Sequence, residues 1–340
     1  MYSDSDLDGA VEAGALSSQS VAAFRAHMAA RNAGPVVDEE HFRLLTGFND
    51  IFVAIAGVLL LVGAGWVGGD MHPALGGGFV AAAAWGLAEY FTRVRRMALP
   101  SIVFLLAFVG GVMTFSTAIL VGETEGSTPD TVQALLLALS AAITAGAAWL
   151  HWRRFRVPIT VAAGAAAAAG VVIALIGAAV GDLERLILPL LFALGLGVFA
   201  LAMRWDMSDT ARATRRSDVA FWLHLLAAPL LVHPIFAGLG LLDGEPGTGA
   251  ALAVIAIYVA MGLIALAIDR RALLVSALGY VLFAIGALFR DFGAVGLNVA
   301  LTALVIGSAL LLLSAFWHRA RKAVLGITPP AIGARLPAAV

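Results

Sequence analysis

Long apolar runs recur along this sequence, and they constrain its fold more than any other feature. A helix rises about 1.5 Å per residue, so about 20 apolar residues cross a hydrocarbon core about 30 Å thick. Only helices and closed barrels satisfy every backbone polar group in lipid, and runs of this length are too long for barrel strands. The runs therefore predict an all-α, polytopic membrane helix bundle. The ten expected transmembrane helices are residues 49–69, 74–92, 99–122, 131–152, 157–181, 186–203, 219–242, 249–268, 272–289 and 294–317.

The charges of the connecting turns support this number of helices and give their orientation. Cationic turns such as "RVRRM" and "DRR" alternate with acidic or neutral turns such as "VGETEGSTPD" and "LDGEPGTG". Basic turns stay on the cytoplasmic side of a membrane. With both the N-terminus and the C-terminus cytoplasmic, all but two of the 21 Lys and Arg residues lie inside, the exceptions being Arg185 and Arg290. A miscounted helix would invert every later turn, so the alternation favours ten crossings.

These patterns divide the chain into three parts. Residues 1–48 are expected to form a cytoplasmic helical segment, capped by Ser17 or Ser18, and an interfacial lead-in. Residues 49–317 form the ten-helix transmembrane domain, and residues 318–340 a basic cytoplasmic tail in contact with membrane lipids. The first segment is either a lead-in that rests on the membrane surface or a module that binds a cytoplasmic protein partner.

Composition and motifs exclude several classes of function. The chain is 61% hydrophobic and 13% charged, whereas soluble domains are closer to half apolar and a quarter charged. A net charge of −1 gives no reason to expect nucleic acid, and the absence of cysteine excludes disulfides and thiol chemistry. The sequence has neither HExxH nor G-x-S-x-G, and its acidic residues stand singly. We therefore expect no cofactor, no metal and no enzymatic activity.

Ionisable side chains inside lipid are costly and mark the candidate sites. The expected spans enclose few of them: Asp50, Glu89, His151, His224 and His233. Asp50 and His151 lie at span ends, where water reaches them. Glu89 is four residues before Arg93, which is the spacing of an ion pair within one helix. An alternative role for Glu89 is to face a polar cavity.

The segment "FWLHLLAAPLLVHPIFAG" carries two of these histidines together with Pro229 and Pro234. The prolines remove backbone donors, which predicts a hinge in a helix whose freed carbonyls face the bundle interior. Depth estimates from the helical rise place His233 at the level of Tyr258, its expected hydrogen-bond partner. They also place His224 in an inward polar layer with Glu89, Asp50 and Asp269.

Part of the chain resembles a known family. The stretches "LDGAVEAGALSSQSVAAF" and "RLLTGFNDIFVAIAGVLLL", followed by Ala-rich and Leu-rich spans, resemble a family of bacterial membrane proteins of unknown function. The resemblance covers mainly residues 1–70, and it implies a bacterial inner-membrane location but no activity. Ten spans with both ends inside are also similar to drug and metabolite transporters built from two inverted five-helix repeats.

Two functions follow as hypotheses. In the first, the protein is a transporter or permease for an unidentified small solute, and His233 responds to a proton because imidazole titrates near neutral pH. In the second, it is a non-transporting scaffold, sensor or accessory subunit that acts through residues 1–48. The histidine itself has a structural alternative, in which His233 only fixes the register of two helices.

Overall fold

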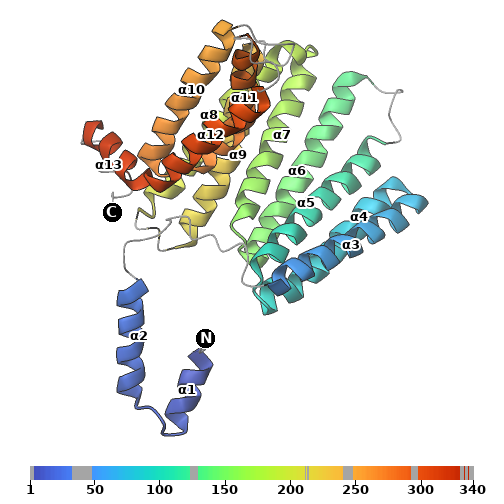
Figure 1. Ribbon diagram of the computed structural model, residues 1–340. Coiled ribbons are helices and arrows are strands. Elements are labelled where there is room, and N and C mark those ends of the chain that lie inside the picture. The colour runs from blue at the N-terminus through green and yellow to red at the C-terminus, as the bar shows by residue number, and fades with distance from the viewer. Residues whose placement is uncertain are drawn as a thin grey trace. The chain divides into compact units, whose positions relative to one another are not determined.

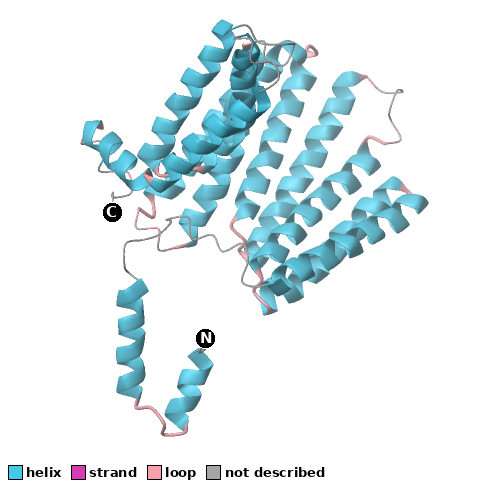
Figure 2. Ribbon diagram, viewed as in Figure 1, coloured by secondary structure: helices cyan, strands magenta, loops and turns pink. Residues whose placement is uncertain are grey.

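Every regular element that the structure describes is a helix (Figures 1 and 2). The computed structural model describes residues 4–32, 48–122, 129–210, 212, 214–239, 248–291, 298–329, 333 and 336. These residues confirm the all-α class. The chain divides into two compact units, Met1–His41 with Val340 and Phe42–Ala339, which are described separately below.

The first unit is a hairpin of two helices, α1 (Asp4–Glu12) and α2 (Ser18–Asn32). Gly14 takes a left-handed conformation in the turn, with φ at 72°. The hydroxyl of Ser17 accepts a hydrogen bond from the backbone N–H of Ser20 at 3.0 Å, which confirms the expected cap of the second helix. The expected interfacial lead-in, residues 33–47, lies outside the described residues.

The second unit is a bundle of helices. Each of the ten expected apolar segments coincides with helix in the structure. Where the predicted spans included residues 240–242 and 294–297, they extend beyond the described residues. The helices are α3 (Phe48–Met71), α4 (Pro73–Leu87), η1 (Ala88–Val94), α5 (Ala98–Leu120), α6 (Asp130–Phe155), α7 (Ile159–Val180), α8 (Glu184–Met207), α9 (Arg215–Gly238), α10 (Thr248–Ile268), α11 (Ala272–Asp291), α12 (Asn298–Ala315) and α13 (Trp317–Ile327). The π-helix η1 continues α4, and α13 is a helix where only a basic tail was expected.

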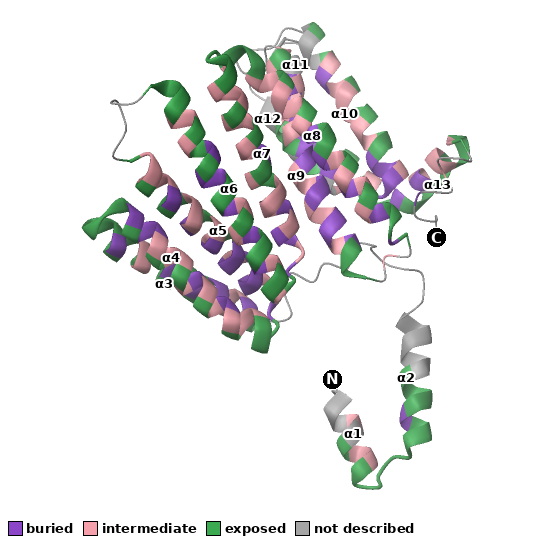
Figure 3. Cartoon of the chain, turned by 180° about the vertical axis from the view of Figure 1, so that it is seen from behind, coloured by how far each residue is buried: buried purple, intermediate pink, exposed green. Residues whose placement is uncertain are grey.

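The described helices have the lengths and apolar composition of a multi-pass membrane protein. Six of them, α3 and α5 to α9, are long and apolar enough to cross a bilayer, or seven with α12 and α13, which are bent by 75°. Shorter apolar stretches occupy α10 and α11. The outward side chains of the spanning helices are apolar. On α3, for example, Phe52, Leu59 and Trp66 are each more than 60% exposed. Figure 3 shows exposed residues along the whole length of α6, as expected for a lipid-facing surface. Ten crossings stay a prediction.

Helix α9 is the central helix of the second half of the bundle. Helices α3 to α7 pack against their neighbours in chain order, and α9 packs against α7, α8 and α11 (Figure 1). Half of the apolar segment of α9 is buried, compared with 17–28% for the other five spanning helices. The two histidines and two prolines of the chain's most unusual segment therefore lie in the most buried of the six spanning helices.

Helices α4 and α5 touch backbone to backbone, because glycines face each other where they cross. A Cβ atom on Gly111 of α5 would lie 2.7 Å from the amide nitrogen of Ala81 and from the carbonyl oxygen of Gly77. A Cβ atom on Gly110, the preceding residue, would meet no atom within 4 Å. Small residues let membrane helices approach closely where lipid supplies no hydrophobic drive between them.

This contact predicts opposite outcomes for two adjacent substitutions. Gly111→Ala is expected to destabilise the protein by about 1–3 kcal/mol, because backbone atoms of α4 must move away. Gly110→Ala is the matched control, and it is expected to be neutral or slightly stabilising because alanine favours helix more than glycine does. Thermal unfolding of the two variants in the same detergent measures the difference. Equal unfolding temperatures would contradict the close approach.

Candidate functional site

Three consecutive charged residues, Asp269, Arg270 and Arg271, form the turn between α10 and α11. Asp269 takes the left-handed conformation with φ at 58°, which ends α10 and lets α11 begin at Ala272. The side chains of the first two are buried, with Arg270 only 1% exposed. Each of the three side chains contacts a different set of partners, so this short turn connects several helices.

Arg270 makes a buried ion pair with Asp206, in the last turn of α8. Its Nε donates to Asp206 Oδ2 at 3.0 Å, and its Nη2 donates to Asp206 Oδ1. Nη2 also donates to the carbonyl oxygen of Ser217 at 3.2 Å and to its Oγ at 3.1 Å, in the first turn of α9. A buried charge is tolerated when it is paired and hydrogen-bonded, and the Asp206 carboxylate and Ser217 supply the counter-ion and the further acceptors for Arg270.

His224 of α9 completes this group from the other side of the carboxylate. Its ring is fully buried, and Nε2 lies 3.0 Å from Asp206 Oδ2. Because the carboxylate beside Arg270 is ionised and only accepts, Nε2 carries the proton and donates. The other ring nitrogen, Nδ1, is buried and has no hydrogen-bond partner among the described residues. His224 therefore presents an unused acceptor inside the bundle.

Asp269 anchors α13 to the same turn. Its Oδ1 accepts from the indole nitrogen of Trp317 at 2.6 Å and lies 3.7 Å from Nε of Arg321, which is 1% exposed. Its Oδ2 accepts from Nη1 of Arg212 at 3.0 Å, and Nη2 of Arg212 donates to the carbonyl oxygens of Ile268 and Asp269. These bonds hold the first turns of α13 against the end of α10 and account for the bend after α12.

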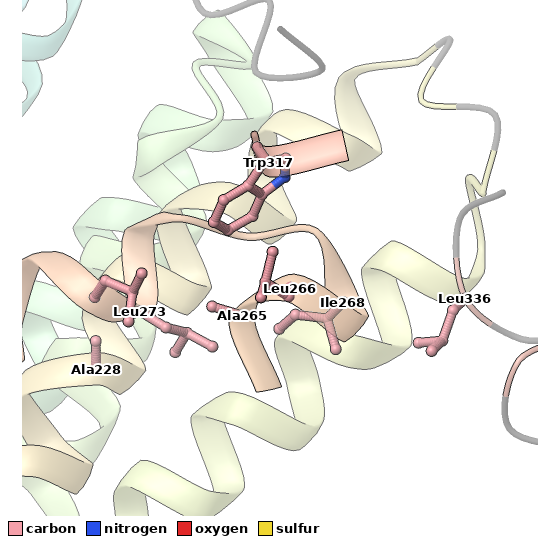
Figure 4. Close-up of a cluster of buried hydrophobic side chains, with 8 residues drawn as sticks. Ala228, Ala265, Leu266, Ile268, Leu273, Trp317 and Leu336 are labelled. Atoms are coloured by element: carbon pink, nitrogen blue, oxygen red, sulfur yellow. The ribbon is translucent and has the colours of Figure 1, made fainter. Parts of the chain in front are cut away.

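An apolar cluster surrounds Trp317 beside these polar contacts. Its buried members are Ala228, Ala265, Leu266, Ile268, Leu273, Leu274, Trp317 and Leu336. In Figure 4 the side chain of Leu266 lies beside the Trp317 ring. The indole thus packs its apolar ring against this cluster and donates through its nitrogen to Asp269, as an amphipathic aromatic side chain does.

His233 lies further along α9 and contacts a different tyrosine from the expected one. Its Nδ1 is 2.7 Å from the hydroxyl of Tyr280 in α11. The hydroxyl of Tyr258 in α10 is buried without a hydrogen-bond partner among the described residues. The expected pairing of His233 with Tyr258 is therefore wrong, because both tyrosines lie at mid-depth and depth alone does not tell which helix is adjacent.

The two prolines lie within α9, which continues as a helix through both of them. Helix α8 packs closely against α9 here: a Cβ atom on Gly195 would lie 3.0 Å from the carbonyl carbon of Leu230, the residue after Pro229. The described backbone does not test whether Pro229 and Pro234 act as a hinge, which stays a prediction.

Glu89 and His224, two residues of the expected inward layer, have separate partners in the structure. Glu89 pairs with Arg93 at 3.3 Å, which confirms the expected ion pair, and also with Arg154 of α6. Arg154 binds it through two hydrogen bonds, from Nε at 2.7 Å and from Nη2 at 2.9 Å. Asp50 is buried in the first turn of α3. His224 bonds to Asp206 instead of to either carboxylate.

The polar group around Asp206 and Arg270 was not predicted from the sequence. The apolar run of the sixth expected span ends at residue 203, and Asp206 lies one turn beyond it in the same helix. Arg270 and Arg212 were expected only as basic residues on the cytoplasmic side, whereas Asp269 was expected in the inward polar layer with His224. The sequence of the turn could have indicated this group. Three consecutive charged residues of both signs, directly between two apolar helices, are too close together for every side chain to reach water.

The polar group consists of ion pairs and hydrogen bonds that join helix ends. Within the described ranges no three His, Cys, Asp or Glu side chains lie close enough to hold a metal ion. Ser217, the serine of this polar group, hydrogen-bonds to Arg270. Comparison with protein-family models, with curated proteins and with solved structures finds no match. The family resemblance of the two N-terminal stretches therefore stays an expectation.

The ion pair predicts a large effect of one neutral substitution. Asp206→Asn is expected to destabilise the protein by about 3–5 kcal/mol, because it leaves Arg270 charged and buried without its counter-ion. The matched control is Asp182→Asn, which removes a pair with Arg185 whose side chains are 56% and 88% exposed. Exposed pairs contribute little, so the control is expected to unfold like the wild type. Denaturant titration in mixed micelles distinguishes them, and equal midpoints would contradict the buried pair.

Proposed function

We propose that this chain is a transporter or permease for a small solute, and that His233 and Tyr280 form its proton-responsive contact. The observation that carries the proposal is the 2.7 Å distance between Nδ1 of His233 and the Tyr280 hydroxyl. A phenol both donates and accepts, so the contact persists whether the imidazole is neutral or protonated, with the direction of the hydrogen bond reversed. Such a pair tolerates a proton inside an apolar bundle.

The surroundings of the pair support this proposal. It joins α9, the helix with the largest buried share, to α11, and His233 is itself only partly buried. Pro229 and Pro234 remove two backbone donors from the same helix, which otherwise continues through both prolines. The hinge role that we assign to the prolines would expose His233 to each side in turn.

We extend the proposal to the topology and location of the chain. Ten crossings with both termini cytoplasmic, in a bacterial inner membrane, agree with the alternating turn charges and with a helix at each expected segment. In this arrangement the α10–α11 turn and its ion pairs lie at the cytoplasmic end of the bundle, and the His233–Tyr280 contact lies nearer the middle.

Proton movement coupled to solute entry tests the proposal. The purified protein is reconstituted into vesicles that contain a trapped pH-sensitive dye, and small organic acids, amines and sugars are added separately outside. At least one class of solute is expected to change the internal pH. His233→Gln is expected to reduce this change tenfold or more, and Tyr280→Phe less, because the ring can still take up a proton. The matched control is His318→Gln, at an exposed histidine of α13.

Two outcomes would contradict the proposal. One is a pH response no larger than that of vesicles without protein for every class of solute. The other is solute entry that is the same in His233→Gln and in the wild type at every pH from 5 to 8, which would remove the proton role and leave His233 as a contact between helices.

A specific observation favours a second candidate, a scaffold or sensor that acts through its N-terminal unit. Residues 1–41 form a compact unit separate from the bundle. Deletion of these residues is expected to leave solute entry unchanged if the protein is a transporter. Loss of cellular function on this deletion, with no effect of His233→Gln, would favour the scaffold.

A further inference from the structure

Two arginine-rich turns lie side by side at one end of the bundle, on the helices that precede α8. One turn leads from η1 into α5, and the other joins α6 to α7. Residues 88–97 and 149–158 contain six arginines and one acidic residue, Glu89. Glu89 links the two segments, because it pairs with Arg93 of η1 and with Arg154 of α6. This end of the bundle therefore carries a large excess of positive charge.

The other four arginines of these turns have no ion-pair or hydrogen-bond partner among the described residues. All of them are exposed, and they are Arg95, Arg96, Arg153 and Arg156. The guanidinium carbon of Arg153 lies 5.1 Å from the centroid of the Trp149 ring, and that of Arg156 lies 5.6 Å from the Trp152 ring. A guanidinium group that stacks on a ring keeps the N–H groups at its edge for an anion.

The backbone of each turn also singles out one arginine. Arg96 and Arg156 take the left-handed conformation, with φ at 54° and 57°. Arg156 is the residue at which α6 ends. Glycine adopts this conformation freely and is the common residue at such helix ends, whereas a residue with a Cβ atom is disfavoured there. Because glycine would form both turns with less strain, the arginines indicate a use for the charge itself.

Apolar and aromatic side chains lie directly beside the arginines and face outward. Tyr90 and Val94 of η1 and Trp149 and Leu150 of α6 are each more than half exposed. Exposed apolar side chains of a membrane bundle face lipid, and exposed aromatic residues near helix ends lie at the level of the headgroups. The arginines therefore lie where the apolar surface ends, which is the level of the lipid phosphates.

We propose that these two turns bind the headgroup of an anionic phospholipid, with Arg95 and Arg96 on one side of it and Arg153 and Arg156 on the other. The forked donors of arginine match the oxygen atoms of a phosphate group, and basic groups between membrane helices bind anionic headgroups in this way. The site binds its lipid at equilibrium, so it does not depend on the proposed transport, and failure of either proposal leaves the other standing.

Equilibrium binding to the full chain in micelles of a neutral detergent tests the site. The probe is phosphatidylglycerol with a fluorescent acyl chain, and phosphatidylcholine with the same chain is the comparison without net charge. Phosphatidylglycerol is expected to bind saturably and about tenfold more tightly. Arg95→Gln with Arg96→Gln, or Arg153→Gln with Arg156→Gln, is expected to weaken its binding about fivefold or more, because each pair supplies part of the contact.

Two further double variants separate specific binding from net charge and from folding. Arg319→Gln with Lys322→Gln removes two exposed positive charges from α13, and this matched control is expected to bind phosphatidylglycerol as the wild type does. Arg96→Gly with Arg156→Gly is expected to weaken binding about fivefold or more. Its unfolding temperature in detergent without added lipid is expected to equal or exceed that of the wild type, because glycine fits the left-handed positions.

Four results would overturn the proposal. Equal binding of the two lipids would remove the headgroup preference, and equal weakening by the α13 control and the turn variants would reduce it to general attraction by positive charge. Displacement of phosphatidylglycerol by inorganic phosphate at constant ionic strength would assign the site to a free anion. Displacement by a polyglutamate peptide under the same conditions would assign it to an acidic protein.

Discussion

The buried ion pair between Asp206 and Arg270 is the interaction on which the second half of the bundle depends. Apolar contacts alone give membrane helices little reason to prefer one neighbour, because lipid tails are as apolar as leucine. A charge inside the bundle is different, since moving it away from its counter-ion is strongly unfavourable. Arg270 reaches from the α10–α11 turn to the end of α8 and the start of α9, so one side chain specifies the positions of three helix ends.

The neighbours of Arg270 in the same turn extend this effect to the rest of the structure. Asp269 binds Trp317 and pairs with Arg321, which fixes α13 at its bend from α12. Arg271 lies over the Trp317 ring. Helix α11, which begins directly after this turn, also carries Tyr280 of the proposed proton-responsive contact.

Much of the fold was predictable from sequence because lipid imposes a single rule on the backbone. Each apolar run of about 20 residues had to be a helix, and each expected segment does fall on one. The Glu89–Arg93 pair was predictable for a similar reason, since both residues lie on one helix at a fixed spacing. The second partner of Glu89, Arg154, comes from another helix, and no periodicity indicates which helices are adjacent.

The candidate site was predictable only in part for the same physical reason. Depth in the membrane follows from residue number, but lateral neighbours follow from packing, so Tyr258 and Tyr280 could not be distinguished as partners of His233. The apolar criterion also ended the sixth span before Asp206, although a paired carboxylate lets the helix continue to Met207. Turn arginines were taken to be solvated, whereas Arg270 is among the most buried side chains described.

A double-mutant cycle between Asp206 and Arg270 tests this account most directly. The free energy of unfolding in mixed micelles is measured for the wild type, Asp206→Asn, Arg270→Gln and the double variant. The account predicts that the double variant is destabilised by at least about 1 kcal/mol less than the sum of the single variants, because each single variant leaves a buried polar group unpaired. Effects that add to within about 0.5 kcal/mol would show that the two residues act independently and would contradict the account.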